Sequence, residues 1–453
     1  MKRLAGVYGC LLILLITACS NASISVTQNA TATPTSGVST FVSFADFLAQ
    51  VKAAKFSDYA KLPDAKVRDE DAFKTMQSYI LQMYDGVQQV SSFIADEHYV
   101  DCITEQSQPS VRRLKIQQIA TPPQGGDLPT GGDGTAPGTN RYGDSLLDQG
   151  LTDAFGHVLT CPNTTIPMQR LQLAIMVRFP TLQAFLAKLP DGKQSDVQDS
   201  PTGQEITPGG SHRYAKGDQY VTNYGGNSWL DLWNPSGDFT LSQQWYAAYT
   251  PSHQTVEGGW VNYPGKFGSQ SVLFIYWTAD NYASTGCYDL ECAGFVQINH
   301  HWYLGGPWDH YSTNGGSQWG FEMQWKLYNG NWWLFLKGPG SYEAVGYYPT
   351  SIYAGGPIAD HAEAAKFGGE TYTGGSNWPQ MGSGQFPSTG WTHAAYQNTI
   401  FYIPHNENGG VGVWSTLSPV ITNPACYLAT IVASSSGGNW GTYLYYGGPG
   451  GGC

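Results

Sequence analysis

Apolar side chains in the first part of the chain recur at three- and four-residue steps. Between residues 42 and 103 this spacing joins, among others, Phe73, Met76, Tyr79, Ile80, Met83 and Tyr84. Such a period places the apolar residues on one face of a helix. Because Pro63-Asp64 interrupts the stretch, we expect two helices there, and a further helix over 168–189 that is broken at Pro180. The segment 108–165 between them is irregular.

After about residue 215 the pattern changes to short runs in which apolar and polar residues alternate. These runs are 239–249, 271–277, 294–298, 321–328, 331–337, 343–348 and 397–402. A period of two is typical of β-strands, and Asn329-Gly330 between two of the runs is a favoured hairpin turn. Many short strands at this density predict an antiparallel sandwich or barrel.

The composition divides the chain at the same place. All 15 tryptophans lie at or beyond Trp229, and only 20 of the 243 residues from Ser211 onward are charged. A polar stretch with several prolines and glycines comes just before, which is typical of a linker. We therefore expect a helical and irregular segment at 41–189, a linker at 190–214 and a mainly β domain at 215–453.

Charge and hydropathy exclude two classes of protein. The formal net charge is −12 at pH 7, whereas a nucleic-acid binder needs a basic surface. The mean hydropathy of −0.29 excludes a polytopic membrane protein. Only 12% of the residues are charged, and the chain has 56 Gly and 29 Tyr. This composition is typical of turns and pleated sheets in a secreted protein.

The N-terminus has the features of an export signal. Lys2 and Arg3 precede an apolar stretch at 7–16 that is too short to span a bilayer. The sequence Ile16-Thr17-Ala18-Cys19 then resembles a bacterial lipobox, in which Cys19 would carry the lipid. An ordinary secretory signal cleaved near Ala22 is the alternative, and a retained membrane anchor is a third. The first two place the folded part outside the cytosol, either secreted or tethered to the cell surface.

Residues 1–19 are thus interpreted as the export signal, and 20–40, rich in Ser, Thr and Ala, as a flexible tether.

Six cysteines remain after this signal, an even number that favours disulfides outside the cytosol. Their spacing suggests the local pairs Cys102 with Cys161, Cys287 with Cys292, and Cys426 with Cys453. The rival interpretation is a zinc site, which would need Cys or His clusters at ligand spacing that the sequence lacks.

Two glutamates stand out in a domain with so few charges. Glu257 and Glu370 each adjoin a glycine pair, and we interpret these glycines as allowing close approach of a substrate. On a strand, alternation would put Glu257 on the same face as Thr255. Two neighbouring carboxyls in an apolar cleft would share one proton, so that one can activate water while the other donates a proton. The alternative is two unrelated glutamates that face solvent.

Other catalytic arrangements have little support in the sequence. It contains neither Gly-x-Ser-x-Gly nor His-Glu-x-x-His, and it has no phosphate-binding glycine loop. His300-His301 and His310 could suggest a metal. However, adjacent strand residues point to opposite faces, so we expect a surface or core role. We expect no cofactor.

The C-terminal half resembles the neprosin family of glutamic peptidases. The motifs that carry the resemblance occur in family order: Glu257-Gly258-Gly259-Trp260, 273–280, Thr285-Gly286-Cys287-Tyr288, 294–299, 331–334, 345–349, Gly368-Gly369-Glu370-Thr371-Tyr372 and 381–384. Gly258 stands where a small Ala is common, and the lipobox differs from plant members. The resemblance implies a β-sandwich of two bent antiparallel sheets with Glu257 and Glu370 as the catalytic dyad. It also implies that 41–189 is an activation segment that blocks the cleft and is removed at acid pH.

These features together predict a secreted, acid-active endopeptidase that is made as a self-inhibited zymogen and acts on proteins or peptides. The resemblance weakly suggests cleavage after proline. We expect a monomer, with Pro201 and Pro208 in the linker as candidate maturation positions. A non-catalytic carbohydrate-binding or adhesive sandwich is the alternative, because Trp-rich sandwiches often stack sugars. A glycoside hydrolase that uses the same two carboxyls is a third hypothesis.

Overall fold

A computed structural model describes residues 40–129, 141–190, 212–434 and 440–453, and they belong to one compact unit, Thr40–Cys453. The export signal with Cys19, nearly all of the tether, and the linker positions Pro201 and Pro208 lie outside the described residues. Within the described ranges, no helix has both the length and the apolar character needed to cross a bilayer.

Three helices open the described chain, and one apolar face of the longest is buried. They are α1 (Phe44–Ala53), α2 (Phe56–Tyr59) and α3 (Glu70–Tyr84). Ser43 and Asp69 cap α1 and α3 by accepting hydrogen bonds from backbone N–H groups of the first turn. Phe73, Met76 and Ile80 on α3 are almost fully buried, which confirms the helical period in this stretch.

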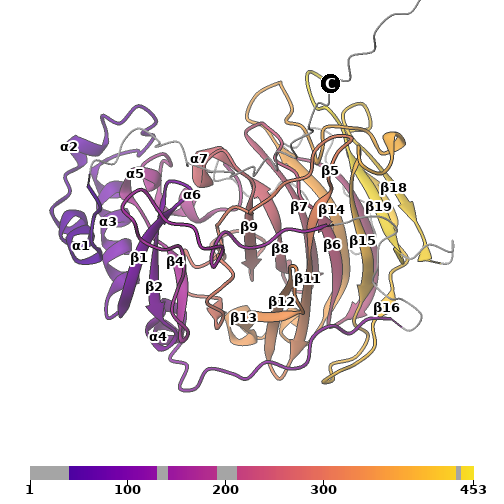
Figure 1. The fold of residues 1–453 in the computed structure, drawn as a ribbon, viewed down its shortest axis with the longest axis horizontal. Helices are drawn as coiled ribbons and strands as arrows, with labels where there is room; N and C mark the ends of the chain where they lie inside the picture. Colours follow the sequence, from indigo (N-terminus) through magenta and orange to yellow (C-terminus); the bar gives the residue numbers. More distant parts are fainter. Residues whose placement is uncertain (1–39, 130–140, 191–211, 435–439) are drawn as a thin grey trace, which may run out of the picture. The chain divides into compact units, whose positions relative to one another are not determined.

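The prediction of helix up to residue 103 is wrong after Tyr84. A three-stranded antiparallel sheet forms instead, from β1 (Gln89–Ala95), β2 (His98–Thr104) and β4 (Thr165–Gln169). Asp96 and Glu97 take positive φ angles of 45° and 70° and turn the chain between β1 and β2. Phe93 and Val100 face a buried cluster, so the apolar residues here follow the strand period. Figure 1 shows this small sheet beside α1 and α3.

The predicted helix over 168–189 is also shorter than expected. Its first residues belong to β4, and only two short helices follow on either side of Pro180: α5 (Leu173–Met176) and α6 (Leu182–Leu186). The remaining elements of the N-terminal segment are the 3-10 turn η1 (Glu105–Ser107), α4 (Pro109–Arg113) and β3 (Arg141–Tyr142).

The rest of the chain is mainly β, as predicted, and its first sheet has six antiparallel strands. Their order is β17 (Ser418–Ile421), β5 (His212–Asn223), β14 (Ala362–Tyr372), β7 (Phe239–Ala248), β8 (Gln254–Asn262) and β9 (Val272–Thr278). The sequence pattern marked β7 and β9 as alternating runs.

A second, larger sheet packs against the first. Its order is β10 (Val296–Gln297), β13 (Glu343–Pro349), β12 (Asn331–Lys337), β11 (Trp319–Tyr328), β6 (Gly225–Asp231), β15 (Ala395–Tyr402), β19 (Tyr443–Gly447) and β18 (Leu428–Val432), with β16 (Val413–Trp414) paired to β15. Asn329 and Gly330 have φ angles of 48° and 70° between paired Tyr328 and Asn331, which confirms the predicted hairpin turn. β3 from the N-terminal segment pairs with β11.

The main core lies between the two sheets and continues into the N-terminal segment. Trp260 on the smaller sheet and Trp325 on the larger one are fully buried in it, together with Phe47 and Met76 of the helices. Short elements complete the fold: α7 (Pro264–Phe267), η2 (Thr350–Tyr353), η3 (Pro357–Ala359) and η4 (Pro387–Thr389).

All three predicted disulfides are confirmed. They join Cys102 to Cys161, Cys287 to Cys292, and Cys426 to Cys453. The first links the small N-terminal sheet to the loop that precedes β4, and the last links the C-terminal residue to Cys426.

Candidate active site

Glu257 and Glu370 lie on two strands of the smaller sheet that flank the same central strand. Glu257 on β8 pairs with Trp245 of β7, and Glu370 on β14 pairs with Leu241 of β7. Trp245 and Leu241 are four residues apart, so their side chains share one face of β7. Both glutamates therefore project from the same face of the sheet.

The glycines beside the glutamates serve packing within the protein, contrary to the expectation that they admit a substrate. A Cβ on Gly258 would come within 2.9 Å of Met323 Sδ on the larger sheet, and one on Gly259 within 2.0 Å of the Ser242 carbonyl oxygen. Behind Glu370, a Cβ on Gly369 would come within 2.7 Å of Met381 Sδ. These glycines allow the second sheet and the neighbouring strand to approach closely, directly behind the carboxylates.

A single lysine of the N-terminal segment connects the two carboxylates. Lys188 Nζ lies 2.5 Å from Glu257 Oε2 and 3.1 Å from Glu370 Oε2. The two Oε2 atoms are therefore no more than about 5.6 Å apart, the sum of those two distances. Glu257 is 0% exposed, Glu370 is 1% exposed and Lys188 is 6% exposed. The structure thus brings together the two carboxyls that the sequence singled out.

Glu257 has hydroxyl donors on its other oxygen. Its Oε1 accepts from Thr255 Oγ1 at 2.7 Å and from Tyr282 Oη at 2.6 Å. The Thr255 contact agrees with the strand alternation expected from the sequence. Burial and the nearby Glu257 raise the pKa of Tyr282 well above its ordinary value, so its hydroxyl keeps its proton and acts as a donor.

Glu370 has a different set of neighbours, which includes an imidazole. His212 Nδ1 donates to Glu370 Oε1 at 2.6 Å, and Tyr214 Oη donates to the same oxygen at 3.2 Å. Gln243 on β7 reaches Glu370 Oε2 with its amide nitrogen at 3.4 Å. His212 and Tyr214 are two positions apart on β5, so their side chains lie on the same face of that strand.

The charges around Glu370 stabilise its ionised form. Burial raises the pKa of Glu370, but Lys188 and His212 outweigh burial and hold it at about 2, below the ordinary value of 4.5. Burial in turn lowers the pKa of Lys188, but the two glutamates outweigh that effect and raise it. The lysine is therefore an ammonium ion that pairs with both glutamates.

The histidines considered for metal binding have other partners. His301 Nε2 lies 2.7 Å from Asp144 and its Nδ1 lies 3.1 Å from Asp148, both in the N-terminal segment. Burial lowers the pKa of His301, but Asp144 outweighs it, and the pKa rises to about 9. His310 contacts the adjacent Asp309. Among the described residues, no three His, Cys, Asp or Glu side chains gather as a metal site would require.

Sequence reasoning missed Lys188, His212 and Tyr282. Lys188 stands alone at the end of an apolar stretch, and His212 stands at the very start of the β region. Tyr282 follows Asp280 in a loop after β9. The carboxylates gave a signal because charges are scarce, whereas the partners of those carboxylates are defined only by the folded chain.

The crystal structure of scytalido-glutamic peptidase with a transition state analog inhibitor matches with a TM-score of 0.30 and 10% identity, over 52% of this chain and 97% of that chain. The same peptidase with a peptide based transition state analog matches with a TM-score of 0.28 and 10% identity, over 52% and 96%.

The match to a family model concerns the β region itself. Residues 236–449 match the model described as neprosin. This range includes Glu257 and Glu370 and all the motifs on which the sequence resemblance rests. The protein therefore carries a neprosin-family domain in residues 236–449.

Proposed function

We propose that this protein is a glutamic endopeptidase in which Glu257 and Glu370 act together to hydrolyse peptide bonds. The neprosin domain supports a peptidase. The observation that carries the catalytic type is the position of Lys188 Nζ, which lies within hydrogen-bond distance of both carboxylates. A water oxygen in that position would contact both Oε2 atoms in the same way, because an ammonium nitrogen and a water oxygen make hydrogen bonds of similar length.

The reaction needs one ionised and one protonated carboxyl. In the proposed reaction, the water oxygen attacks the scissile carbonyl carbon while Glu370 takes a proton from that water. Glu257 gives its proton to the carbonyl oxygen. When the carbon–nitrogen bond breaks, Glu370 passes its proton to the leaving nitrogen. Glu257 recovers its proton from the hydroxyl of the intermediate, so the dyad returns to its starting state.

The neighbours of the two glutamates support this division of roles. Without Lys188, Glu370 keeps the hydrogen bond from His212 Nδ1, and this contact favours the ionised carboxylate. Glu257 keeps only the hydroxyls of Thr255 and Tyr282, which carry no charge. We therefore assign the role of base to Glu370 and the role of acid to Glu257.

Replacing His212 by glutamine tests that assignment. Since His212 lowers the pKa of Glu370, His212→Gln should move the acidic limb of the pH profile of kcat/KM to higher pH, by about one unit. The alkaline limb should stay in place. The measurement is the pH dependence of peptide cleavage by the matured enzyme. An unchanged acidic limb in an active variant would contradict the role given to Glu370.

The full chain is proposed to be a zymogen that Lys188 keeps inactive. The lysine occupies the position of the water and pairs with both glutamates. Because the pKa of Glu370 is depressed, its contacts stabilise this arrangement fully at pH values above the ordinary pKa of 4.5. That contribution is lost as the pH falls toward about 2. At Asp144, the effect of His301 likewise outweighs the effect of burial, and the pKa of the Asp144 carboxyl falls below 3.8. Acid therefore weakens two contacts that hold the N-terminal segment.

Acid treatment should convert the purified full-length protein into a shorter form. We expect a cut in the linker 190–214, which would release Lys188 with the N-terminal segment, and Pro201 and Pro208 are the proposed positions. N-terminal sequencing of the product reads the cut site. A chain that is active at acid pH while still intact would contradict the zymogen proposal. Digestion of a peptide library by the product would show whether cleavage follows proline.

The carbohydrate-binding alternative finds little support in the side chains. Stacking on a sugar needs exposed aromatic rings. Among the described tryptophans, only Trp391 is exposed, at 39%, and most of the others belong to the core.

Secretion or lipid tethering at Cys19 stays a proposal that rests on the sequence alone.

A further inference from the structure

The main chain just before Lys188 is held by side chains of the β region. Lys266 Nζ donates to the Phe185 carbonyl oxygen at 2.5 Å, and Tyr276 Oη donates to that of Leu186 at 3.2 Å. Tyr288 Oη donates to the carbonyl oxygen of Lys188 itself at 2.7 Å. Three side-chain donors of the β region thus bind three carbonyl groups within residues 185–188, next to the catalytic pair.

None of these three contacts depends on the side chains of the N-terminal segment. Each donor meets a backbone carbonyl, which every residue of a peptide offers. Ala187 has φ and ψ of −62° and 151°, so the chain is extended as it leaves α6. Phe185 and Leu186 still belong to the last turn of α6, whereas Lys188 follows in the extended part. A main chain bound through its carbonyls next to the catalytic carboxyls is held as a peptide substrate would be.

Tyr276 and Tyr288 lose these partners when the N-terminal segment leaves, and Lys266 keeps only its ion pair with Glu291. Lys266, Tyr276 and Tyr288 are each no more than 1% exposed in the full chain. A buried donor without a partner is destabilising, so after release these groups require water or another carbonyl. A substrate peptide in the same place would supply the carbonyls.

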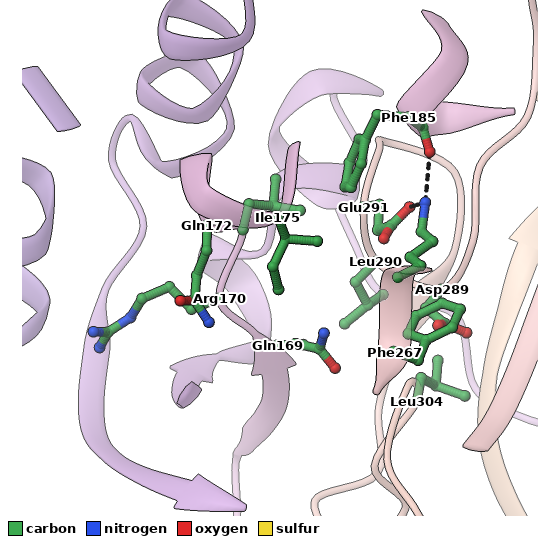
Figure 2. A pocket seen from close by; sticks show the side chains of 12 residues that line it. Gln169, Arg170, Gln172, Ile175, Phe185, Phe267, Asp289, Leu290, Glu291 and Leu304 are labelled. Atoms are coloured by element: carbon green, nitrogen blue, oxygen red, sulfur yellow. Dashed lines mark hydrogen bonds and ion pairs between the residues drawn. The ribbon is translucent and has the colours of Figure 1, made fainter. Parts of the chain in front are cut away.

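A pocket lies beside the first of these contacts. Figure 2 shows Phe185 and Glu291 on its wall, with dashed lines that join both to the same lysine nitrogen. Its lining comes from both the N-terminal segment, including Gln169, and the β region, including Leu304. Burial raises the pKa of Glu291 to about 7, although Lys266 opposes the shift. In acid Glu291 is therefore neutral and no longer competes with a carbonyl for the ammonium of Lys266.

We infer that Lys266, Tyr276 and Tyr288 form the site that binds the main-chain carbonyls of a peptide substrate. The inference rests on the proposed function and names the substrate-binding residues of the same site. A substrate that runs in the same direction as residues 185–188 places these carbonyls on the N-terminal side of the scissile bond. The enzyme therefore acts on peptides with several residues before the cut, and their side chains matter less than their backbone.

The test compares the matured wild type with Tyr288→Phe and Tyr276→Phe on two fluorogenic peptides. One peptide has four residues on the N-terminal side of the cut, and the other has a single capped residue there. Each substitution should lower kcat/KM for the long peptide about 10-fold, mainly through KM, and leave the short peptide within about twofold. Lys266→Met should act in the same way as the two Tyr→Phe variants.

A matched control is Tyr427→Phe. The Tyr427 hydroxyl donates to the Pro379 carbonyl oxygen at 2.6 Å, so this variant loses the same kind of bond away from residues 185–188. It should leave the ratio between the two peptides unchanged.

The outcomes separate the inference from the function beneath it. Equal losses on the long and short peptides, or faster loss of the N-terminal segment with unchanged kinetics of the matured form, would overturn the binding site while the peptidase stands. The binding site would also be overturned if the loss caused by the substitutions depended on the number of substrate residues on the C-terminal side of the cut. Failure of the matured wild type to cut either peptide would contradict the proposed function itself.

Discussion

Glu257→Gln and Glu370→Gln are each expected to lower the acid peptidase activity of the matured protein by about 10²–10⁴-fold, the usual contribution of one general acid or base. Glutamine keeps the size of the side chain but can neither take a proton from water nor release one. The two losses should not add in the double variant, because the carboxyls act as a unit. Casein digestion at acid pH measures the effect.

Glu363→Gln is the matched control for this experiment. Glu363 lies on β14 with Glu370, but its carboxylate accepts a hydrogen bond from the Tyr249 backbone N–H at 2.9 Å. The control should digest casein like the wild type. Activity of both dyad variants at the wild-type level would show that the assignment of the catalytic pair is wrong.

The second large effect is expected at Lys188 in the full chain. Methionine has a similar length but no charge, so Lys188→Met leaves the two carboxylates facing each other without a cation. Lys188 and His212 together hold the pKa of Glu370 at about 2, and removing one partner of a buried ion pair typically costs about 3–5 kcal/mol. We therefore expect the N-terminal segment to be released about 10²-fold faster after a shift to acid, and at a higher pH than in the wild type. The rate at which the short form appears on gels measures this.

Lys188→Arg is the control, because it keeps the positive charge. It should remain latent at neutral pH and mature with nearly the wild-type pH dependence. A Met variant that matures no faster than the wild type would mean that the ion pair does not hold the segment, whatever the function of the two glutamates.

The sequence predicts the β region and singles out two carboxyls that the structure brings together, because those signals are local. The hairpin at Asn329-Gly330 follows from residues that tolerate positive φ. Glu257 and Glu370 could be singled out because charges are scarce around them.

The errors arise where tertiary contacts decide. The apolar residues of the β1–β2 hairpin adjoin the helical pattern of α3, so the sequence predicts helix there. Only the turn at Asp96 and Glu97 and the pairing with β4 reveal strands. The sequence likewise suggests substrate approach at the glycine pairs, whereas a residue on the other sheet, Met323, explains Gly258. No local pattern could bring Lys188 to residues 69 and 182 positions away.

A crystal structure of the acid-matured protein, at a pH where it cleaves peptides, tests the central claim most directly. The account predicts that residues before the linker are gone and that one water oxygen lies within hydrogen-bond distance of both Glu257 Oε2 and Glu370 Oε2, where Lys188 Nζ lies in the full chain. Carboxylates that turn to separate surfaces, or a side chain of the β region that fills the space between them, would contradict it.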